Sequence, residues 1–493
     1  MTFALPRSTG RLVGAAAALA MLAVPALAQD AAPPTPDKGD MTFMYIATIL
    51  VLLMTVPGLA LFYGGLVRTK NMLSMCMQVF ATMCLVMLLW VTYGYSMAFT
   101  NGGALNDFVG GFGKAFLSGV DSSSLAATFS NGVYIPEYLY ICFQMTFAAI
   151  TPALILGAVA ERIKFSAVLL FMALWVTLIY FPMAHMVWYW AGPDAVGNAA
   201  KAVAEAAEGD AKIAAQAALD AVNSDAGLLF KWGAFDFAGG TVVHINAGIA
   251  GLVACLVLGK RVGYGKEAMP PHSLVMCMIG AALLWVGWFG FNVGSNLEAN
   301  AWIGVVTINT FVATAAAGLS WLIVEWLAKG KPSLLGLVSG VIAGLVAITP
   351  ACGFAGVFGS IILGLVAGIV CFIFCTAIKH AFGYDDSLDV FGIHGVGGIV
   401  GALATGLLIN PDFGGSGIPD YISKPGELTT APYDMVFQMT AQAKAVGFTV
   451  LFSGLGTLII LLLVKMVVGL RLSEDKEREG LDISDHGERA YNY

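Results

Sequence analysis

Two histidines lie in long apolar segments of the sequence, and the residues around them follow one pattern. His244 lies in GGTVVHINAGIAGLVACLVLG and His394 in DDSLDVFGIHGVGGIVGALATGLL. An aspartate precedes each by eight residues, Asp236 and Asp386, and His-x-x-x-Gly-Ile-x-Gly follows in both. Neutral imidazole offers one donor and one acceptor, so a facing pair can bond a small polar molecule or relay a proton. Ionisable groups in apolar spans are costly and tend to line pathways.

Two other interpretations of these histidines need weighing. A single histidine in an apolar segment is more often a packed ring that bonds a nearby backbone group, but its repetition favours a pathway. Zinc is the rival chemistry, and it fails on ligand count, because no third His, Cys or carboxylate repeats beside the pair. No TVGYG-like carbonyl filter for metal cations is present either. We therefore expect no metal and no other cofactor.

The elements that must position the pair are membrane helices. The chain has 493 residues, of which 58% are hydrophobic and 11% charged, with a mean hydropathy of +0.83. These values predict an all-α integral membrane protein in contact with membrane lipid, and no basic patch suggests a nucleic-acid partner. Windows of about 20 apolar residues predict eleven transmembrane helices. They are centred near residues 54, 86, 147, 177, 248, 283, 314, 341, 366, 400 and 456.

Basic residues orient these spans, because Lys and Arg favour cytoplasmic loops. Every odd-numbered span is followed by at least one, whereas the loops after the sixth and eighth spans carry none and those after the second and tenth carry one each, Lys114 and Lys424. The basic residues after odd-numbered spans are Arg68, Lys70, Arg162, Lys164, Lys260, Arg261, Lys266, Lys329, Lys331, Lys379, Arg471, Lys476 and Arg478. The pattern predicts an N-terminus outside and a C-terminus in the cytoplasm.

The chain divides into four parts. Residues 1–28 have two arginines, an apolar run and ALA at the end, which predicts a cleaved signal peptide; an uncleaved first helix is the alternative. A periplasmic linker (29–41), a membrane domain (42–470) and a polar cytoplasmic tail (471–493) follow. The membrane domain includes a long extracellular loop, about residues 191–235, whose strong helix formers predict a surface helix or helical hairpin.

The repeated histidine pattern also predicts an internal duplication. The copies are 150 residues apart, on the fifth and tenth predicted spans. An offset of five spans reverses direction, so spans 1–5 and 6–10 would form two inverted five-helix repeats, with a final helix after them. Such a repeat has its axis near the middle of the membrane. We therefore expect His244 and His394 to face each other across a central path.

Several longer motifs extend this interpretation to a family. They are TVPGLALFYGGLVRTKN, LGAVAERIKFSA, AHMVW, DFAGGTVVHINA, GWFGFNVGS, GKPSLLG, TPACG and DVFGIHGVGGIVG. Together and in this order they resemble the bacterial ammonium transporters of the Amt/MEP/Rh family, from about Met41 through EREGLDISDHGERAY.

The resemblance implies roles for individual residues. The outer mouth, where ammonium is recruited, would consist of Trp188, Phe147, Phe143 and Ser295, with Asp236 near it. Phe147 and Phe291 would form a stacked gate, and Trp288 would line the pore beside His244 and His394. Asp236 has two compatible roles, capping backbone amides and favouring cation entry. For Asp386 and Asp389 we expect structural roles.

The resemblance further implies a transporter in the bacterial inner membrane rather than an enzyme. It implies a homotrimer whose tail couples subunits and meets a PII-type (GlnK-like) regulator of nitrogen metabolism. An ammonium sensor with little transport is the alternative; it would be expected to keep the mouth and alter one pore histidine, and both histidines are present. A membrane metal or haem enzyme is a second alternative and predicts bound metal.

Overall fold

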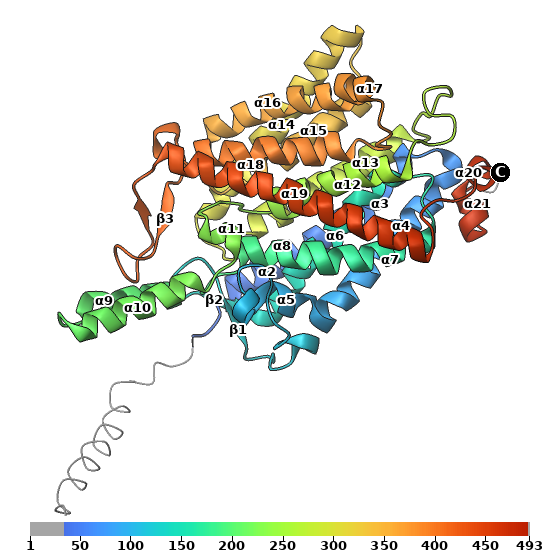
Figure 1. The fold of residues 1–493 in the computed structure, drawn as a ribbon. Helices are drawn as coiled ribbons and strands as arrows, with labels where there is room; N and C mark the ends of the chain where they lie inside the picture. The colour runs from blue at the N-terminus through green and yellow to red at the C-terminus, as the bar shows by residue number, and fades with distance from the viewer. Residues whose placement is uncertain (1–33, 492–493) are drawn as a thin grey trace, which may run out of the picture. The chain divides into compact units, whose positions relative to one another are not determined.

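The structure is a computed structural model that describes residues 34–491. The predicted signal peptide, residues 1–28, lies outside the described residues. The described part of the chain is mostly helical, and most helices run side by side in one bundle (Figure 1). The protein is therefore a multi-pass membrane protein, as its composition predicts.

Ten helical segments in residues 34–491 are long and apolar enough to cross a membrane. The first five are α2 (Lys38–Leu53) with η1 (Met54–Leu59) and α3 (Ala60–Leu66); η2 (Thr69–Asn71) with α4 (Met72–Leu89), η3 (Trp90–Gly94) and α5 (Tyr95–Phe99); α6 (Glu137–Val159); α7 (Phe165–Trp175) with η6 (Val176–Tyr180) and α8 (Phe181–Trp188); and η7 (Gly240–Ile245) with α12 (Asn246–Leu258). The other five are α13 (Leu274–Gly294); α14 (Trp302–Lys329); α16 (Val357–Ile373) with η8 (Phe374–Ile378) and α17 (Lys379–Phe382); η9 (Phe391–Gly395) with α18 (Val396–Leu408); and α19 (Met435–Val467).

A shorter apolar helix, α15 (Leu334–Ile348), lies at the predicted eighth span. Its 15 residues fall below the roughly 20 that a straight crossing needs. The Oγ atom of Ser333 caps its start by accepting a hydrogen bond from the backbone N–H of Gly336 at 2.9 Å. After α15 the chain continues as a buried turn, residues 349–355. Ten long spans and one short apolar helix are thus present where eleven spans were predicted.

The segments differ in how deeply they are buried. In both α6 and the η7–α12 segment, 78% of the apolar window is buried inside the protein, against 28% for α19. Among the ten long segments, these two are therefore the most enclosed by protein. α19 and α16 instead expose most of their apolar side chains, which is typical of a surface that faces lipid.

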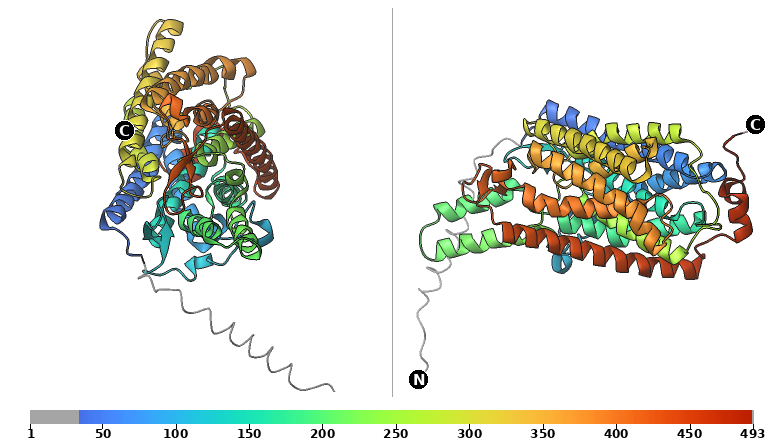
Figure 2. Two further views of the ribbon diagram at one scale, coloured as in Figure 1. Left: turned by 90° about the vertical axis from the view of Figure 1, so that its left-hand side faces the viewer. Right: turned by 90° about the horizontal axis from the view of Figure 1, so that it is seen from above.

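One end of the bundle, which we call the hairpin end, carries the connecting segments with the most structure. Helices α9 (Pro193–Glu205) and α10 (Asp210–Ser224) form a hairpin there, followed by α11 (Leu228–Lys231) (Figures 1 and 2). Two antiparallel strand pairs accompany it: β1 (Leu125–Ala127) with β2 (Tyr134–Pro136), and β3 (Ile418–Asp420) with β4 (Thr429–Ala431). The 3₁₀ turns in the connecting segments of this end are η4 (Gly103–Leu105), η5 (Ala115–Leu117) and η10 (Pro411–Phe413). This hairpin agrees with the helix formers of that loop.

The opposite end, the tail end, carries two short helices, α20 (Glu474–Glu479) and α21 (Leu481–His486) (Figure 1). Asp482 accepts hydrogen bonds from the backbone N–H groups of Leu73 and Ser74, at 3.1 and 2.8 Å, in the first turn of α4. Asp485 accepts one from the N–H of Phe165 at the start of α7, at 3.0 Å. A carboxylate at a helix N-terminus satisfies free amides and complements the helix dipole. The tail is therefore attached to two spans.

Candidate functional site

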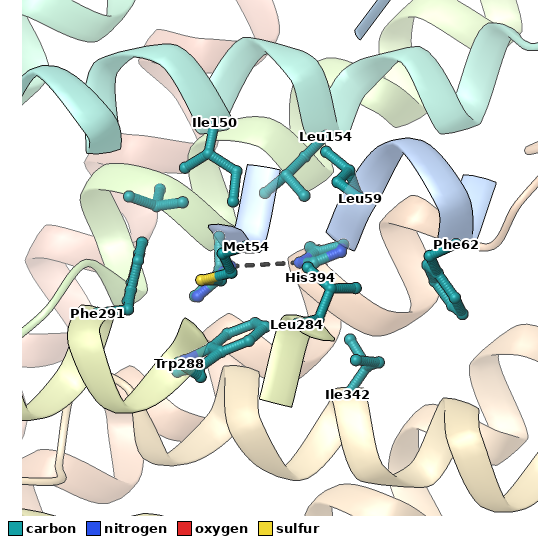
Figure 3. Close-up of a pocket in the computed structure, with 12 residues that line it drawn as sticks. Met54, Leu59, Phe62, Ile150, Leu154, Leu284, Trp288, Phe291, Ile342 and His394 are labelled. Carbon is teal, nitrogen blue, oxygen red and sulfur yellow. Dashed lines mark hydrogen bonds between the residues drawn. The ribbon is translucent and has the colours of Figure 1, made fainter. Parts of the chain in front are cut away.

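His244 and His394 meet inside the protein. The Nδ1 atoms are 3.2 Å apart, a hydrogen-bond distance, and the ring planes are tilted by 22° with centroids 5.3 Å apart. Both side chains are buried. Nε2 of His244 has no hydrogen-bond partner within residues 34–491. The structure thus brings together the two residues that the sequence repeat pairs; Figure 3 labels His394 and marks their hydrogen bond with a dashed line.

The repeated aspartates hold the backbone that carries these rings. The carboxylate of Asp236 accepts hydrogen bonds from the backbone N–H groups of residues 239–242, at 2.6 to 3.1 Å. Asp386 accepts hydrogen bonds from the N–H groups of Val390 and Phe391, at 3.1 and 2.7 Å. Each carboxylate caps a π-helical turn, η7 or η9, on which the histidine lies. The aspartate eight residues before each histidine therefore caps the helical turn that carries that histidine.

Glycines let the two histidine segments pack closely and reciprocally. A Cβ atom on Gly248 would lie 2.1 Å from the backbone nitrogen of Gly395, the residue after His394. A Cβ atom on Gly398 would lie 3.0 Å from the backbone nitrogen of Ile245, the residue after His244. α12 packs on η9, and α18 packs on η7. Small residues at such crossings allow this backbone approach.

A narrow cavity runs beside the pair and is lined almost wholly by apolar side chains. Trp288 stacks on His244, with ring centroids 5.4 Å apart and planes tilted by 19°. Its indole N–H donates to the hydroxyl of Thr349 at 2.9 Å, which fixes the ring. The lining residues are Met54, Leu59, Phe62, Ile150, Leu154, Val243, His244, Leu284, Trp288, Phe291, Ile342 and His394 (Figure 3). Apart from the imidazoles and the indole, the cavity thus offers no polar side chain.

Two stacked phenyl rings lie where this cavity approaches the hairpin end. The rings of Phe147 and Phe291 have centroids 4.1 Å apart and planes tilted by 21°. Phe291 also lines the cavity, whereas Phe147 contacts Trp188 edge-on at 6.0 Å. Both phenyl rings are fully buried. The stack therefore separates the cavity from the side on which Trp188 lies.

The predicted mouth residues occupy different depths. Trp188 is half-buried, and its indole N–H donates to the carbonyl oxygen of Asp236 at 3.0 Å. Ser295 is buried, and its hydroxyl donates to the carbonyl oxygen of Phe291 at 2.8 Å, which leaves its oxygen lone pairs able to accept. Phe143 is fully buried against Phe147, with centroids 4.9 Å apart. Phe143 therefore packs directly against the Phe147 ring.

Sequence reasoning missed most of the cavity wall. The apolar lining residues come from several separate helices and share no motif, so no pattern in the sequence marks them. Thr349, which holds the Trp288 ring, could have been found from the sequence. It lies in TPACG, one of the family-like motifs, and a hydroxyl in a buried segment needs a hydrogen-bond partner. Within residues 34–491, no group of three or more His, Cys, Asp or Glu side chains is arranged to hold a metal ion.

A model of the Ammonium Transporter Family matches residues 42–491. An ammonium transporter of Aquifex aeolicus (strain VF5) is 43% identical over 461 residues, which cover 92% of this chain and 94% of that protein. The chain belongs to the ammonium transporter family.

Solved structures of related proteins share the fold. The crystal structure of Saccharomyces cerevisiae Mep2 is similar, with a TM-score of 0.71 and 30% sequence identity, covering 89% of this chain and 91% of that one. A sensor Amt protein gives a TM-score of 0.74 at 24% identity, covering 91% and 98% of the two chains. The histidine pair of this family member therefore lies in a fold already known among Mep2 and Amt proteins.

Proposed function

We propose that this protein transports ammonium, passing it as ammonia through the cavity beside His244 and His394. The histidine pair in an otherwise apolar, internal cavity is the observation that carries this proposal. A cavity lined by hydrocarbon disfavours a bare cation strongly, whereas it admits a small neutral molecule. The imidazoles supply the donor and acceptor that such a molecule needs on its way.

Recruitment takes place at the outer mouth. The faces of Trp188 and Phe147 attract a compact cation, and the Ser295 oxygen accepts one of its hydrogens. The Asp236 carboxylate contributes mainly as a cap, because its oxygens are occupied by backbone amides. Phe143 keeps the Phe147 ring in place. The mouth thus binds ammonium in its charged form.

Passage then requires the gate to open and the proton to leave. The stacked rings of Phe147 and Phe291 leave no room for a hydrated ion, so ammonium loses its water as it crosses them. It gives a proton to Nε2 of His244, which has no hydrogen-bond partner in the described part of the chain. Ammonia continues past Trp288 to the histidine pair. The hydrogen bond between the two Nδ1 atoms offers a separate route by which the proton can follow.

The architecture that fits this function has eleven crossings. α15 and the buried turn after it make the eighth crossing together, because irregular backbone is tolerated at membrane depth when protein surrounds it. Spans 1–5 and 6–10 then form two inverted repeats, and α19 follows. The reciprocal packing of α12 on η9 and of α18 on η7 supports this symmetry. We place the hairpin end outside and the tail end in the cytoplasm of a bacterium, with the protein in its inner membrane.

The tail has a regulatory role in this proposal. Its helices α20 and α21 lie against the starts of α4 and α7, so whatever pulls the tail away changes two spans at once. We propose a homotrimer, and a PII-type (GlnK-like) regulator that binds at the tail end. The hydrogen bonds of Asp482 and Asp485 support such a coupling.

The deciding experiment measures current in proteoliposomes after an ammonium pulse. The wild-type protein is compared with His244→Ala and His394→Ala, and sodium and potassium pulses serve as controls. We expect a saturable, ammonium-specific signal that is lost in both variants. If current is absent, internal alkalinisation reveals electroneutral ammonia passage; absence of both signals from the wild-type protein overturns the transport proposal and favours an ammonium sensor.

A further inference from the structure

The buried ring of His185 bonds two backbone carbonyl groups at once. His185 lies on α8, one turn before Trp188, and is fully buried. Its Nδ1 atom is 3.0 Å from the carbonyl oxygen of Ala98, and its Nε2 atom is 2.7 Å from the carbonyl oxygen of Asn106. A carbonyl oxygen can only accept, so each ring nitrogen must donate. Neutral imidazole has one N–H group, whereas imidazolium has two.

A neutral ring does not fit these contacts. Either tautomer would leave one bare nitrogen facing a carbonyl oxygen, lone pair against lone pair. The distances of 2.7 and 3.0 Å are both those of N–H···O hydrogen bonds. Turning the ring over exchanges its atoms but leaves the same two acceptors in place. The geometry therefore requires two donors from one side chain.

Burial disfavours a charged ring, so the charge needs compensation from its neighbours. The ring of Tyr189 stacks on that of His185, with centroids 4.5 Å apart and planes tilted by 14°. An aromatic face at this distance attracts a cation. The Tyr189 hydroxyl in turn donates to Oδ1 of Asp225 at 3.1 Å. The imidazole is thus stacked on the ring of Tyr189, and that tyrosine in turn is hydrogen-bonded to the carboxylate of Asp225.

Asp225 is also joined to the second carbonyl acceptor. Its Oδ1 atom accepts a hydrogen bond from the side-chain amide of Asn106 at 3.0 Å, and the carbonyl of the same Asn106 takes the Nε2 proton. The other charges nearby neutralise each other, since Lys231 pairs with Asp107 at 2.6 Å. Among the ion pairs found within residues 34–491, Asp225 has none. Its negative charge therefore favours a positive ring at His185.

We propose that His185 is held as an imidazolium and is a positioning residue for ammonium recruitment. This inference rests on the proposed function, because it acts through Trp188. The two N–H groups tie the last turn of α8 to the chain between Ala98 and Asn106. Trp188 follows three residues later and contacts Phe147. Loss of either donor loosens the turn that presents the indole at the mouth.

The first test observes the protonation state directly. The full-length protein, labelled with ¹⁵N in its histidines, is reconstituted in lipid vesicles and studied by solid-state NMR at pH 7. The chain has six histidines, and comparison with His185→Gln identifies the resonances of this one. In the wild-type spectrum we expect both ring nitrogens of His185, whose resonances are absent from His185→Gln, to carry protons. A ring with one bare nitrogen overturns the proposal, and this readout does not depend on transport.

The second test measures ammonium uptake in proteoliposomes. His185→Phe keeps a ring beside Tyr189 but has no donor, whereas His185→Gln keeps two N–H bonds on its amide. His185→Phe removes both donors that hold the turn carrying Trp188, so we expect it to raise the half-saturating concentration about tenfold, which corresponds to about 1.4 kcal/mol. The maximal rate should stay within about twofold, and His185→Gln should recover most of the wild-type half-saturation. Equal values for wild type and His185→Phe overturn the positioning role.

Tyr189→Leu provides an independent variant in case His185→Phe does not fold. It removes the stacked π face and the hydroxyl that bonds Asp225, but it retains both carbonyl acceptors. We expect the His185 ring to lose a proton in this variant at pH 7, which the same NMR measurement detects. A ring that stays doubly protonated contradicts the compensation by Tyr189. If the wild-type protein takes up no ammonium, the proposed function is overturned. The NMR measurement would still decide whether His185 is protonated on both nitrogens.

Discussion

At the scale of single residues, the hydrogen bonds of Asp236 distinguish its two expected roles, capping backbone amides and attracting a cation. Its carboxylate accepts hydrogen bonds from four consecutive backbone amides, and its own carbonyl accepts the indole N–H of Trp188. A carboxylate engaged in this way has little free capacity for a passing cation. Its main contribution is to hold η7, and through η7 the ring of His244.

We predict that Asp236→Ala destabilises the protein by about 2 to 4 kcal/mol, because several buried amides lose their acceptor. Thermal unfolding in detergent measures this, with exposed Asp412→Asn as the matched control at the same end of the bundle. Asp386→Ala should behave like Asp236→Ala. An unchanged melting temperature together with a raised half-saturating ammonium concentration would instead assign Asp236 to cation attraction.

At this scale the sequence was most informative where a pattern repeats. The eight-residue spacing from aspartate to histidine predicted the pair, and the structure places the Nδ1 atoms of the two rings 3.2 Å apart. Nothing in the sequence marked Ile150 or Ile342 as part of the cavity wall, because apolar residues are common in every span. Residues whose role depends on contacts between distant helices need the structure.

At the scale of elements, the crossing of α12 and η9 depends on a missing side chain. Gly248 approaches Gly395 so closely that an added Cβ atom would lie 2.1 Å from a backbone nitrogen. Backbone cannot yield as a flexible side chain does, so the two segments would have to separate. Such a separation also moves His244 away from His394.

We therefore predict that Gly248→Ala abolishes transport and lowers the yield of folded protein. Gly447→Ala on α19 is the matched control, because nothing lies within 4 Å of its added Cβ atom. That control should be neutral or stabilising by about 0.5 to 1 kcal/mol, since alanine favours the helix. Size-exclusion profiles and ammonium uptake measure both variants. A well-folded, active Gly248→Ala protein would show that the crossing tolerates separation.

The tail helices provide a second prediction at this scale. Asp482→Ala and Asp485→Ala remove caps worth about 1 kcal/mol each, so the double variant should release the tail from α4 and α7. Limited proteolysis should then cleave after residue 472 faster than in the wild type. Exposed Glu474→Gln is the control and should leave the cleavage rate unchanged. Equal cleavage of all three proteins would mean that other contacts hold the tail.

The positions of the helices followed from hydropathy, but their internal geometry did not. Every predicted span centre falls on a helix, and the one near residue 341 falls on the short α15. The π-helical turns η7 and η9 were not predicted, because hydropathy averages over a whole span and is blind to one extra residue in a turn. These turns aim the histidine rings, so the site geometry depends on a feature that the sequence did not reveal.

At the scale of the whole molecule, buried charges join the connecting segments of the tail end. Glu161 pairs with Arg68 at 2.7 Å and with Arg261 at 3.2 Å, and Arg261 also pairs with Asp385 at 2.8 Å. Burial acts to raise the pKa of Glu161, but the hydrogen bond from Arg68 and the charge of Arg261 outweigh it. The pKa of this carboxyl therefore lies below its ordinary value.

The lowered pKa of Glu161 determines how the stability of the protein depends on pH. A carboxyl whose pKa is lowered by folding stabilises the protein above its unfolded pKa of about 4.3, and the contribution is lost as pH falls through the folded pKa. Glu161→Gln should therefore melt below the wild type at pH 7, and the difference should shrink below about pH 4. Melting curves from pH 7 to pH 3 measure this. A difference that grows on acidification would contradict the assigned sign.

In the proton relay proposed above, the contact between the two histidines limits how soon a second proton can follow the first. With one proton between the Nδ1 atoms, one neutral ring has a bare Nε2 and the other an Nε2–H, so the row of atoms is polar. A proton that enters at the bare nitrogen and leaves from the far side reverses that polarity. Both rings must then exchange tautomers before a second proton can cross in the same direction. In this proposed relay each proton must wait until both tautomers have been reset, so the pair passes protons one at a time with a delay between them.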